Sequence, residues 1–109
     1  MNKRQTFAAE MTKLLNGNFR YGGWFEDPNA LPYGQYAEDS SYYVYGDDKP
    51  YAKPKSYIVR VVNSHKDFEL EAAIERLFES LEIPYKKLTD EIIYFEKAYV
   101  LEWVFELIE

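Results

Sequence analysis

The residue types that most often perform chemistry are scarce in this chain of 109 residues. It has one histidine, His65, and no cysteine, so cysteine nucleophiles, thiolate zinc sites and disulfides are excluded. Ser64, His65 and Asp67 stand close together in the sequence, but the members of a nucleophilic triad converge on a site from different elements. We therefore expect His65 to be an exposed residue in the first turn of a helix.

The acidic residues do not follow a metal-binding pattern. Glu38-Asp39 and Asp47-Asp48 are adjacent pairs, whereas calcium loops need spaced oxygen ligands. Gly22-Gly23 opens no strand–loop–helix unit of the kind that cradles phosphate. A pair of carboxylates acting as general acid and base would need a cleft and a raised pKa on one of them, and the sequence indicates neither. The sequence thus predicts a protein that is not an enzyme and that holds no metal or cofactor.

Composition narrows the class of protein further. The chain has 13 Lys and Arg against 19 Asp and Glu, a net charge of −6, and 47% of its residues are apolar. This is too much apolar material for a disordered chain, and the length fits one domain, 1–109. An acidic chain binds the phosphate backbone poorly, so we expect no nucleic-acid partner. No apolar run approaches the roughly 18 residues of a membrane-spanning helix, so we expect no membrane partner.

Aromatic residues are the main excess, at 18% of the chain, and 11 of them are tyrosines. One small core cannot hold so many rings, and tyrosine suits contacts with partners because its ring is apolar while its hydroxyl can stay wet. Tyrosine-rich strands in a small β protein are the alternative explanation. Several of the tyrosines lie close together in the sequence, at Tyr42, Tyr43, Tyr45, Tyr51 and Tyr57.

Hydrophobic spacing predicts two helices. The first covers 2–16, where apolar residues recur at helical intervals up to the stop signal Asn16-Gly17. The second begins at Ser64, which with Asp67 resembles a capping box, and continues to Glu82. An acidic stripe runs along this second helix, and like charges four residues apart repel one another. Either water solvates the stripe, or a basic patch on a neighbouring copy offsets the repulsion. The acidic stripe consists of Glu71, Glu75, Glu79 and Glu82.

The remaining segments predict loops and strands. Residues 17–41 form an irregular region rich in glycine and aromatic residues, with short extended pieces at 19–25 and 31–36. Residues 42–53 have the pattern of a hairpin with a charged tip. Ser56–Asn63 is apolar on both faces, which is typical of a central strand.

After the second helix, 84–88 and 92–95 are short extended segments. Residues 98–108 form the longest strand, whose core face alternates strictly through Tyr99, Leu101, Trp103, Phe105 and Leu107. The simplest fold is α+β: a mostly antiparallel sheet of about four strands with two helices packed on one face. The N-terminal helix occupies 1–16, the irregular region 17–41 and the hairpin–strand–helix–strands core 42–109.

The second half of the chain contains a Tyr…Asp-Lys…Tyr hairpin pattern at 43–53, the strand 57–62 with Lys66-Asp67 after it, Ile83–Lys87, and a Glu-Lys-x-Tyr turn at 96–99. In these motifs it resembles a family of small proteins from long-tailed phages and prophages of Gram-positive bacteria. Leu31-Pro32-Tyr33 matches an early element of that family. Two features depart from its pattern: the glycine- and aromatic-rich residues 17–30, and Arg60, where an acidic residue is common.

The family is similar in size and element order to head–tail joining, tail terminator and tail completion proteins. The resemblance implies a virion protein at the head–tail junction, made in the bacterial host cytoplasm, that forms a hexameric ring. Its implied partners are copies of itself, the tail tube protein and the head connector. A head-to-tail ring needs two complementary patches on each subunit, and the candidate interface residues are Tyr43, Tyr45, Asp47, Asp48, Lys49, Tyr51, Arg60, Glu71, Glu75, Glu79, Lys86 and Lys87.

A different function would also account for the negative charge. A phage-encoded inhibitor that mimics nucleic acid could block a basic host protein through an acidic surface. In this chain, however, the acids are interleaved with lysines and do not form one band. We keep the inhibitor as the alternative function.

Overall fold

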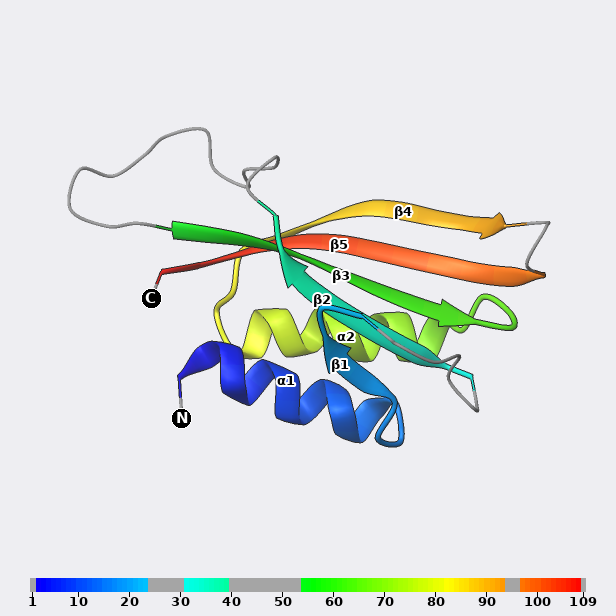
Figure 1. Ribbon diagram of the computed structural model, residues 1–109, viewed down its shortest axis with the longest axis horizontal. Coiled ribbons are helices and arrows are strands. Elements are labelled where there is room, and N and C mark those ends of the chain that lie inside the picture. Colours follow the sequence, from blue (N-terminus) through cyan, green and yellow to red (C-terminus); the bar gives the residue numbers. More distant parts are fainter. Residues whose placement is uncertain (1, 24–30, 40–53, 94–96, 109) are drawn as a thin grey trace.

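A computed structural model describes residues 2–23, 31–39, 54–93 and 97–108 of the chain. Two helices and five strands lie within these ranges (Figure 1). Their order along the chain is α1 (Lys3–Leu14), β1 (Phe19–Tyr21), β2 (Tyr33–Glu38), β3 (Pro54–Asn63), α2 (Phe68–Ser80), β4 (Tyr85–Ile93) and β5 (Ala98–Ile108).

The five strands form one sheet in the order β1-β2-β3-β5-β4. The pair β1–β2 is parallel and the other three pairs are antiparallel. The predicted α+β class and the mostly antiparallel sheet are confirmed, and β3 is central, as expected. The predicted number of about four strands is too low, because two pieces of the region predicted to be irregular join the sheet: Phe19–Tyr21 pairs with Tyr33–Glu38, which in turn pairs with β3.

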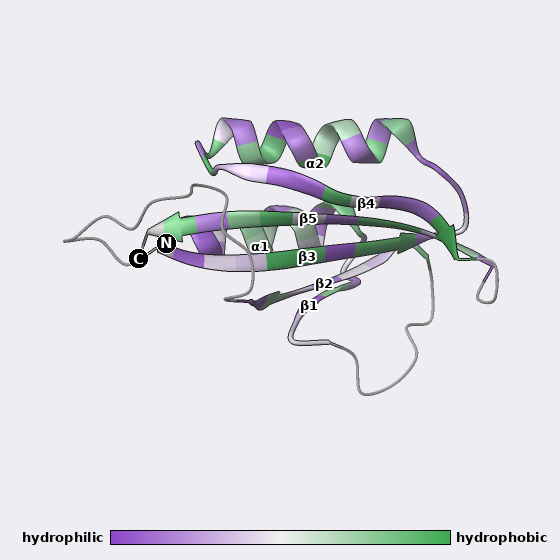
Figure 2. Cartoon of the chain, turned by 90° about the horizontal axis from the view of Figure 1, so that it is seen from above, coloured by the Kyte–Doolittle hydropathy of each residue, from purple (hydrophilic) through white to green (hydrophobic). Residues whose placement is uncertain are grey.

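Both helices cover the same face of the sheet, as predicted, and the main core lies between the helices and the sheet (Figures 1 and 2). Alternate residues of β3 and β5 point to this face, which is why the regular alternation of 98–108 is a reliable core signal. Among the largest fully buried side chains are Trp103, Phe7, Phe78, Phe105 and Met11. Phe7 stacks on Phe78 with ring centroids 5.0 Å apart, so the two helices meet through their aromatic residues.

Two predicted boundaries are wrong. The second helix begins at Phe68, not at Ser64, because the Asp67 side chain is the N-cap and accepts a hydrogen bond from the Leu70 amide at 3.0 Å. The extended segments predicted on either side of 89–91 are one strand, β4, whose register shifts between Lys87 and Thr89. A β-bulge of this kind interrupts the polar–apolar alternation, so the strand looks broken in the sequence. The hairpin predicted at 42–53 lies outside the described residues.

A close approach of α1 to the sheet requires glycine at position 34. A Cβ atom there would lie 2.8 Å from Leu15 Cδ1 and 3.1 Å from the carbonyl oxygen of Arg60. Leu15 is fully buried, so it has little room to give way. The absence of a side chain at Gly34 therefore lets the end of the first helical segment pack directly on β2.

We expect Gly34→Ala to lower the free energy of unfolding by about 1–3 kcal/mol, since an added methyl group overpacks a filled core. Urea unfolding measures the change. Gln35→Ala, one residue along β2 and on the other face, is the control and should change stability by no more than about 0.5 kcal/mol. Equal effects of the two substitutions would contradict this account of Gly34.

Candidate functional site

A cluster of charged side chains joins α2 to β4 on the helix-covered face. Its centre is Glu71, which is 8% exposed. Lys66, just before α2, donates to Glu71 Oε2 at 3.1 Å and to Asp90 Oδ2 at 2.5 Å. Lys87 of β4 also donates to Glu71, and the Tyr99 hydroxyl donates to Asp90. Two lysines thus share two carboxylates, so no charge in the cluster is buried alone.

This pairing displaces the pKa values of both carboxylates. Burial by itself would raise the pKa of Glu71, but hydrogen bonds from Lys87 and Lys66 outweigh burial and hold the pKa below its ordinary value. Hydrogen bonds from Lys66 and Tyr99 lower the pKa of Asp90 to about 2. Both groups are therefore ionised at neutral pH, which suits an ion pair and not a catalytic acid.

Two other acids of the stripe, Glu75 and Glu79, also find partners within the chain. Glu75 accepts a hydrogen bond from Trp103 Nε1 at 2.9 Å, and Glu79 accepts one from the Tyr85 hydroxyl at 2.7 Å. The hydrogen bond to Glu79 raises the pKa of Tyr85 to about 12. The expectation that water solvates the stripe is wrong for the buried Glu71. A basic patch on a neighbouring copy is not needed to offset the repulsion, because Lys66 and Lys87 do so.

Lys87 and Lys86 provide a matched comparison of a paired and an unpaired lysine. We expect Lys87→Met to lower the free energy of unfolding by about 1–2 kcal/mol, because Glu71 then loses one of its two cations. Lys86 is exposed and contacts no acid among the described residues, so Lys86→Met should change stability by no more than about 0.5 kcal/mol. Chemical denaturation of both variants at neutral pH measures the difference.

The lowered pKa of Asp90 makes the stability depend on acid. Its folded pKa of about 2 lies below the usual value of 3.8, so its contribution is complete above pH 4 and is lost as the pH falls through 2. Solvent screening limits this contribution to about 1 kcal/mol, since the side chain is 30% exposed. In Asp90→Asn, the fall in stability between pH 4 and 2 should be shallower than in the natural protein. Parallel curves would contradict the pairing.

A second polar group lies on the opposite face of the sheet, where no described helix packs. Register pairs Arg20 with Gln35, Gln35 with Arg60, and Arg60 with Glu102. On β4, Thr89 stands opposite Glu102 and its hydroxyl donates to Glu102 Oε1 at 2.6 Å. One polar row therefore crosses all five strands. Apolar residues of the same face, among them Val62 and Val100, form a small buried cluster of their own.

Arg60 is the exceptional member of this row. Its Nε atom is buried and has no hydrogen-bond partner within the described part of the chain. It borders a hollow of about 220 Å³ whose wall also includes Gln35, Glu38 and Glu102. Burying a guanidinium N–H without an acceptor is unfavourable, so this position would gain stability from an acceptor supplied by another molecule.

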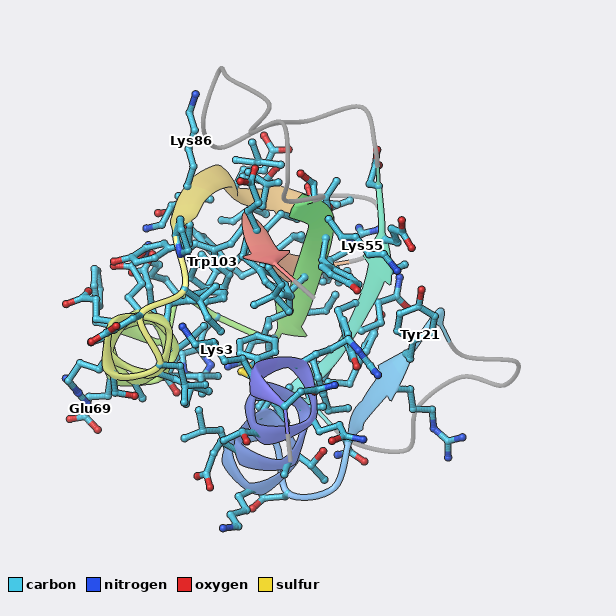
Figure 3. All side chains as sticks on the ribbon, turned by 90° about the vertical axis from the view of Figure 1, so that its left-hand side faces the viewer. Lys3, Tyr21, Lys55, Glu69, Lys86 and Trp103 are labelled. Atoms are coloured by element: carbon cyan, nitrogen blue, oxygen red, sulfur yellow. The ribbon has the colours of Figure 1, made fainter. Side chains whose placement is uncertain are left out.

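The predicted interface residues fall into three groups. Tyr43, Tyr45, Asp47, Asp48, Lys49 and Tyr51 lie outside the described residues. Glu71, Glu75, Glu79 and Lys87 are brought together between α2, β4 and β5. Arg60 and Lys86 lie on the opposite face, and Figure 3 shows Lys86 directed away from the molecule while Trp103 lies inside it. His65 is exposed, as predicted, but it precedes α2 and is not in its first turn, because the helix begins at Phe68.

Sequence reasoning missed Gln35, Thr89 and Glu102 as members of one polar row. No local signal marks them, because they come from three strands and meet only through the sheet register. Within the described ranges, no group of three histidines or acids could hold a metal ion. None of the helices described is long and apolar enough to cross a membrane.

Comparison with known proteins adds no family. The sequence matches no protein-family model, and no curated protein matches it. Function is therefore inferred from the residues and from their arrangement.

Proposed function

We propose that this protein is a phage structural protein at the head–tail interface of the virion, of the tail terminator or tail completion type. It would assemble in the host cytoplasm as a ring that caps the tail tube and joins it to the head connector. The resemblance of residues 42–109 to the phage family motivates the proposal. The observation that carries it is that both described helices cover one face of the sheet, while on the other face the buried Arg60 Nε has no acceptor among the described residues.

The shape of the sheet supports assembly into a ring. Its two edge strands differ: β4 has nine residues, while β1 has three. A subunit with two unlike edges favours a head-to-tail contact, and such contacts close into a ring when the rotation between subunits is a whole fraction of a turn. A twofold dimer would instead need one patch that is complementary to itself.

The charge pairs within the chain bear on the choice among the predicted interface residues. Glu71 and Lys87 are engaged with each other inside the chain, so neither is a candidate for the main contact. Arg60 and Lys86 make no such pair among the described residues. The inhibitor alternative gains no support, because a mimic of nucleic acid needs exposed, unneutralised acids, whereas Glu71 is buried between two lysines.

Tails assembled without this protein test the proposal. Deleting its gene from the phage or prophage that carries it should give overlong tail tubes in negative-stain images, because nothing then stops tube growth. Supplying the natural protein from a plasmid should restore a single tail length. The matched control is the same plasmid with a stop codon before β1, which should leave the tubes overlong.

The alternative outcomes are distinct. Tails of normal length, detached from full heads, would assign a joining role and would remove the terminator function. Intact infectious particles of normal appearance would contradict the whole proposal, including the placement of the protein in the virion.

A further inference from the structure

The outer side of β4 is an unpaired strand edge among the described residues. β4 stands last in the sheet order and pairs only with β5. In Figure 1 it forms the upper edge of the sheet, and both helices lie below it. An edge of nine residues is long enough to pair with a strand of another molecule. The side chains of β4 therefore decide which strand fits there.

The charged residues of β4 have opposite signs in its two halves. Lys86 and Lys87 lie in the first half, and Asp90 and Glu91 lie in the second. The same strand followed in the opposite direction therefore has acids where the first has lysines. Two β4 strands placed antiparallel, with their centres between positions 88 and 89, bring each lysine opposite an acid of the other copy. Such an edge is complementary to itself, which is what a twofold contact requires.

The register shift in β4 puts the two charges of the outer pair on the same face of the sheet. Lys86 and Glu91 stand opposite Val104 and Val100, which share the face away from the helices. In a regular strand, residues five apart would lie on opposite faces, and the extra residue of the bulge cancels this difference. Lys86 and Glu91 are exposed, and neither makes an ion pair among the described residues. Both are therefore available to a second copy, whereas the other two charges of β4 belong to the internal cluster around Glu71.

The backbone of β4 points outward at matching positions. The amide of Glu106 in β5 donates to the carbonyl oxygen of Pro84 at 3.1 Å. Because backbone direction alternates along a strand, Tyr85 directs its N–H and C=O away from β5. The same alternation along β5 directs the backbone of Glu91 toward β5 and that of Ile92 away from it. Tyr85 of one copy and Ile92 of another can thus exchange both backbone hydrogen bonds at the register that the charges select.

We propose that the β4 strands of two copies pair antiparallel across a twofold axis, with Lys86 of each copy beside Glu91 of the other. The two sheets then join into one. Ile92, which is 50% exposed, is covered by Tyr85 of the second copy, since both side chains lie on the helix-covered face. A second copy is the occupant because the charges, the faces and the backbone direction of this edge all match its own sequence at the same register. This contact concerns the free protein. It goes beyond the proposed ring, which forms on the tail, and does not rest on it.

The absence of cysteine allows the register to be measured directly. Opposite residues that exchange no backbone hydrogen bonds have Cα atoms about 4.5 Å apart, which is within disulfide reach. Under mild oxidation, we expect a mixture of the Lys86→Cys and Glu91→Cys proteins to form at least about tenfold more disulfide-linked dimer than either variant alone. In either variant alone, the two cysteines would be five positions apart along the paired strands. That separation is about 16 Å and exceeds disulfide reach.

Sedimentation equilibrium provides an independent measurement. The natural protein should show a mass that rises with concentration toward twice the chain mass of 13.0 kDa. Lys86→Glu places two acids together at both symmetry-related positions and should raise the dissociation constant of the dimer by at least about tenfold. Lys86→Glu/Glu91→Lys should return it to within about threefold of the natural value. The control Lys13→Glu makes the same change in net charge on α1, away from β4 (Figure 1), and should change the constant by no more than about twofold.

The outcomes are separate from those of the proposed function. A natural protein that stays at the mass of one chain up to about 1 mM would overturn the contact. The contact is also wrong if Lys86→Glu dimerises as well as the natural protein, or if the mixed cysteine variants give no more disulfide than each alone. These measurements use the free protein, so their failure would leave the proposed function standing. Deletion of the gene tests that function without reference to this contact.

Discussion

The buried carboxylate of Glu71 fixes how α2 lies on the sheet. A charge at 8% exposure is tolerated only with close partners, and its two partners come from different places: Lys66 precedes the helix and Lys87 is on β4. The helix, the turn before it and the edge strand must therefore be in place together. Glu75 and Glu79 extend the same attachment through Trp103 and Tyr85.

The sheet register also separates charges that are neighbours in the sequence. Strand alternation sends Lys87 toward α2 and Lys86 to the opposite face, so these two lysines have different surroundings. The same rule separates Tyr57 and Val59, which are in the core, from Ile58 and Arg60, which face away from the helices. A charged cluster on the helix-covered face and a polar row on the other face follow from one sheet whose two described helices lie on the same side.

Sequence patterns predicted the elements whose neighbours are close in the chain or whose burial is uniform. The apolar faces of Ser56–Asn63 correctly indicated a central strand, and the alternation of 98–108 correctly indicated the longest strand and its core face. The short strands Phe19–Tyr21 and Tyr33–Glu38 were not predicted as part of the sheet, because only pairing with the distant β3 stabilises them. The partners of Glu71 were equally hidden, since Lys87 lies 16 positions away on another element. The helix start was missed because Asp67, not Ser64, satisfies the first free amide.

The edge strand β4 combines an exposed backbone edge with features that oppose unspecific strand pairing. A nine-residue edge with open backbone groups is a hazard for unspecific pairing. Charged residues such as Lys86 and Glu91, and the register shift after Lys87, make β4 a poor template for an arbitrary strand. Pairing with an arbitrary strand would bring the Lys86 ammonium group against that strand's side chains and remove part of its hydration, which costs free energy. Lys86 therefore helps to protect the exposed edge from unspecific strand pairing.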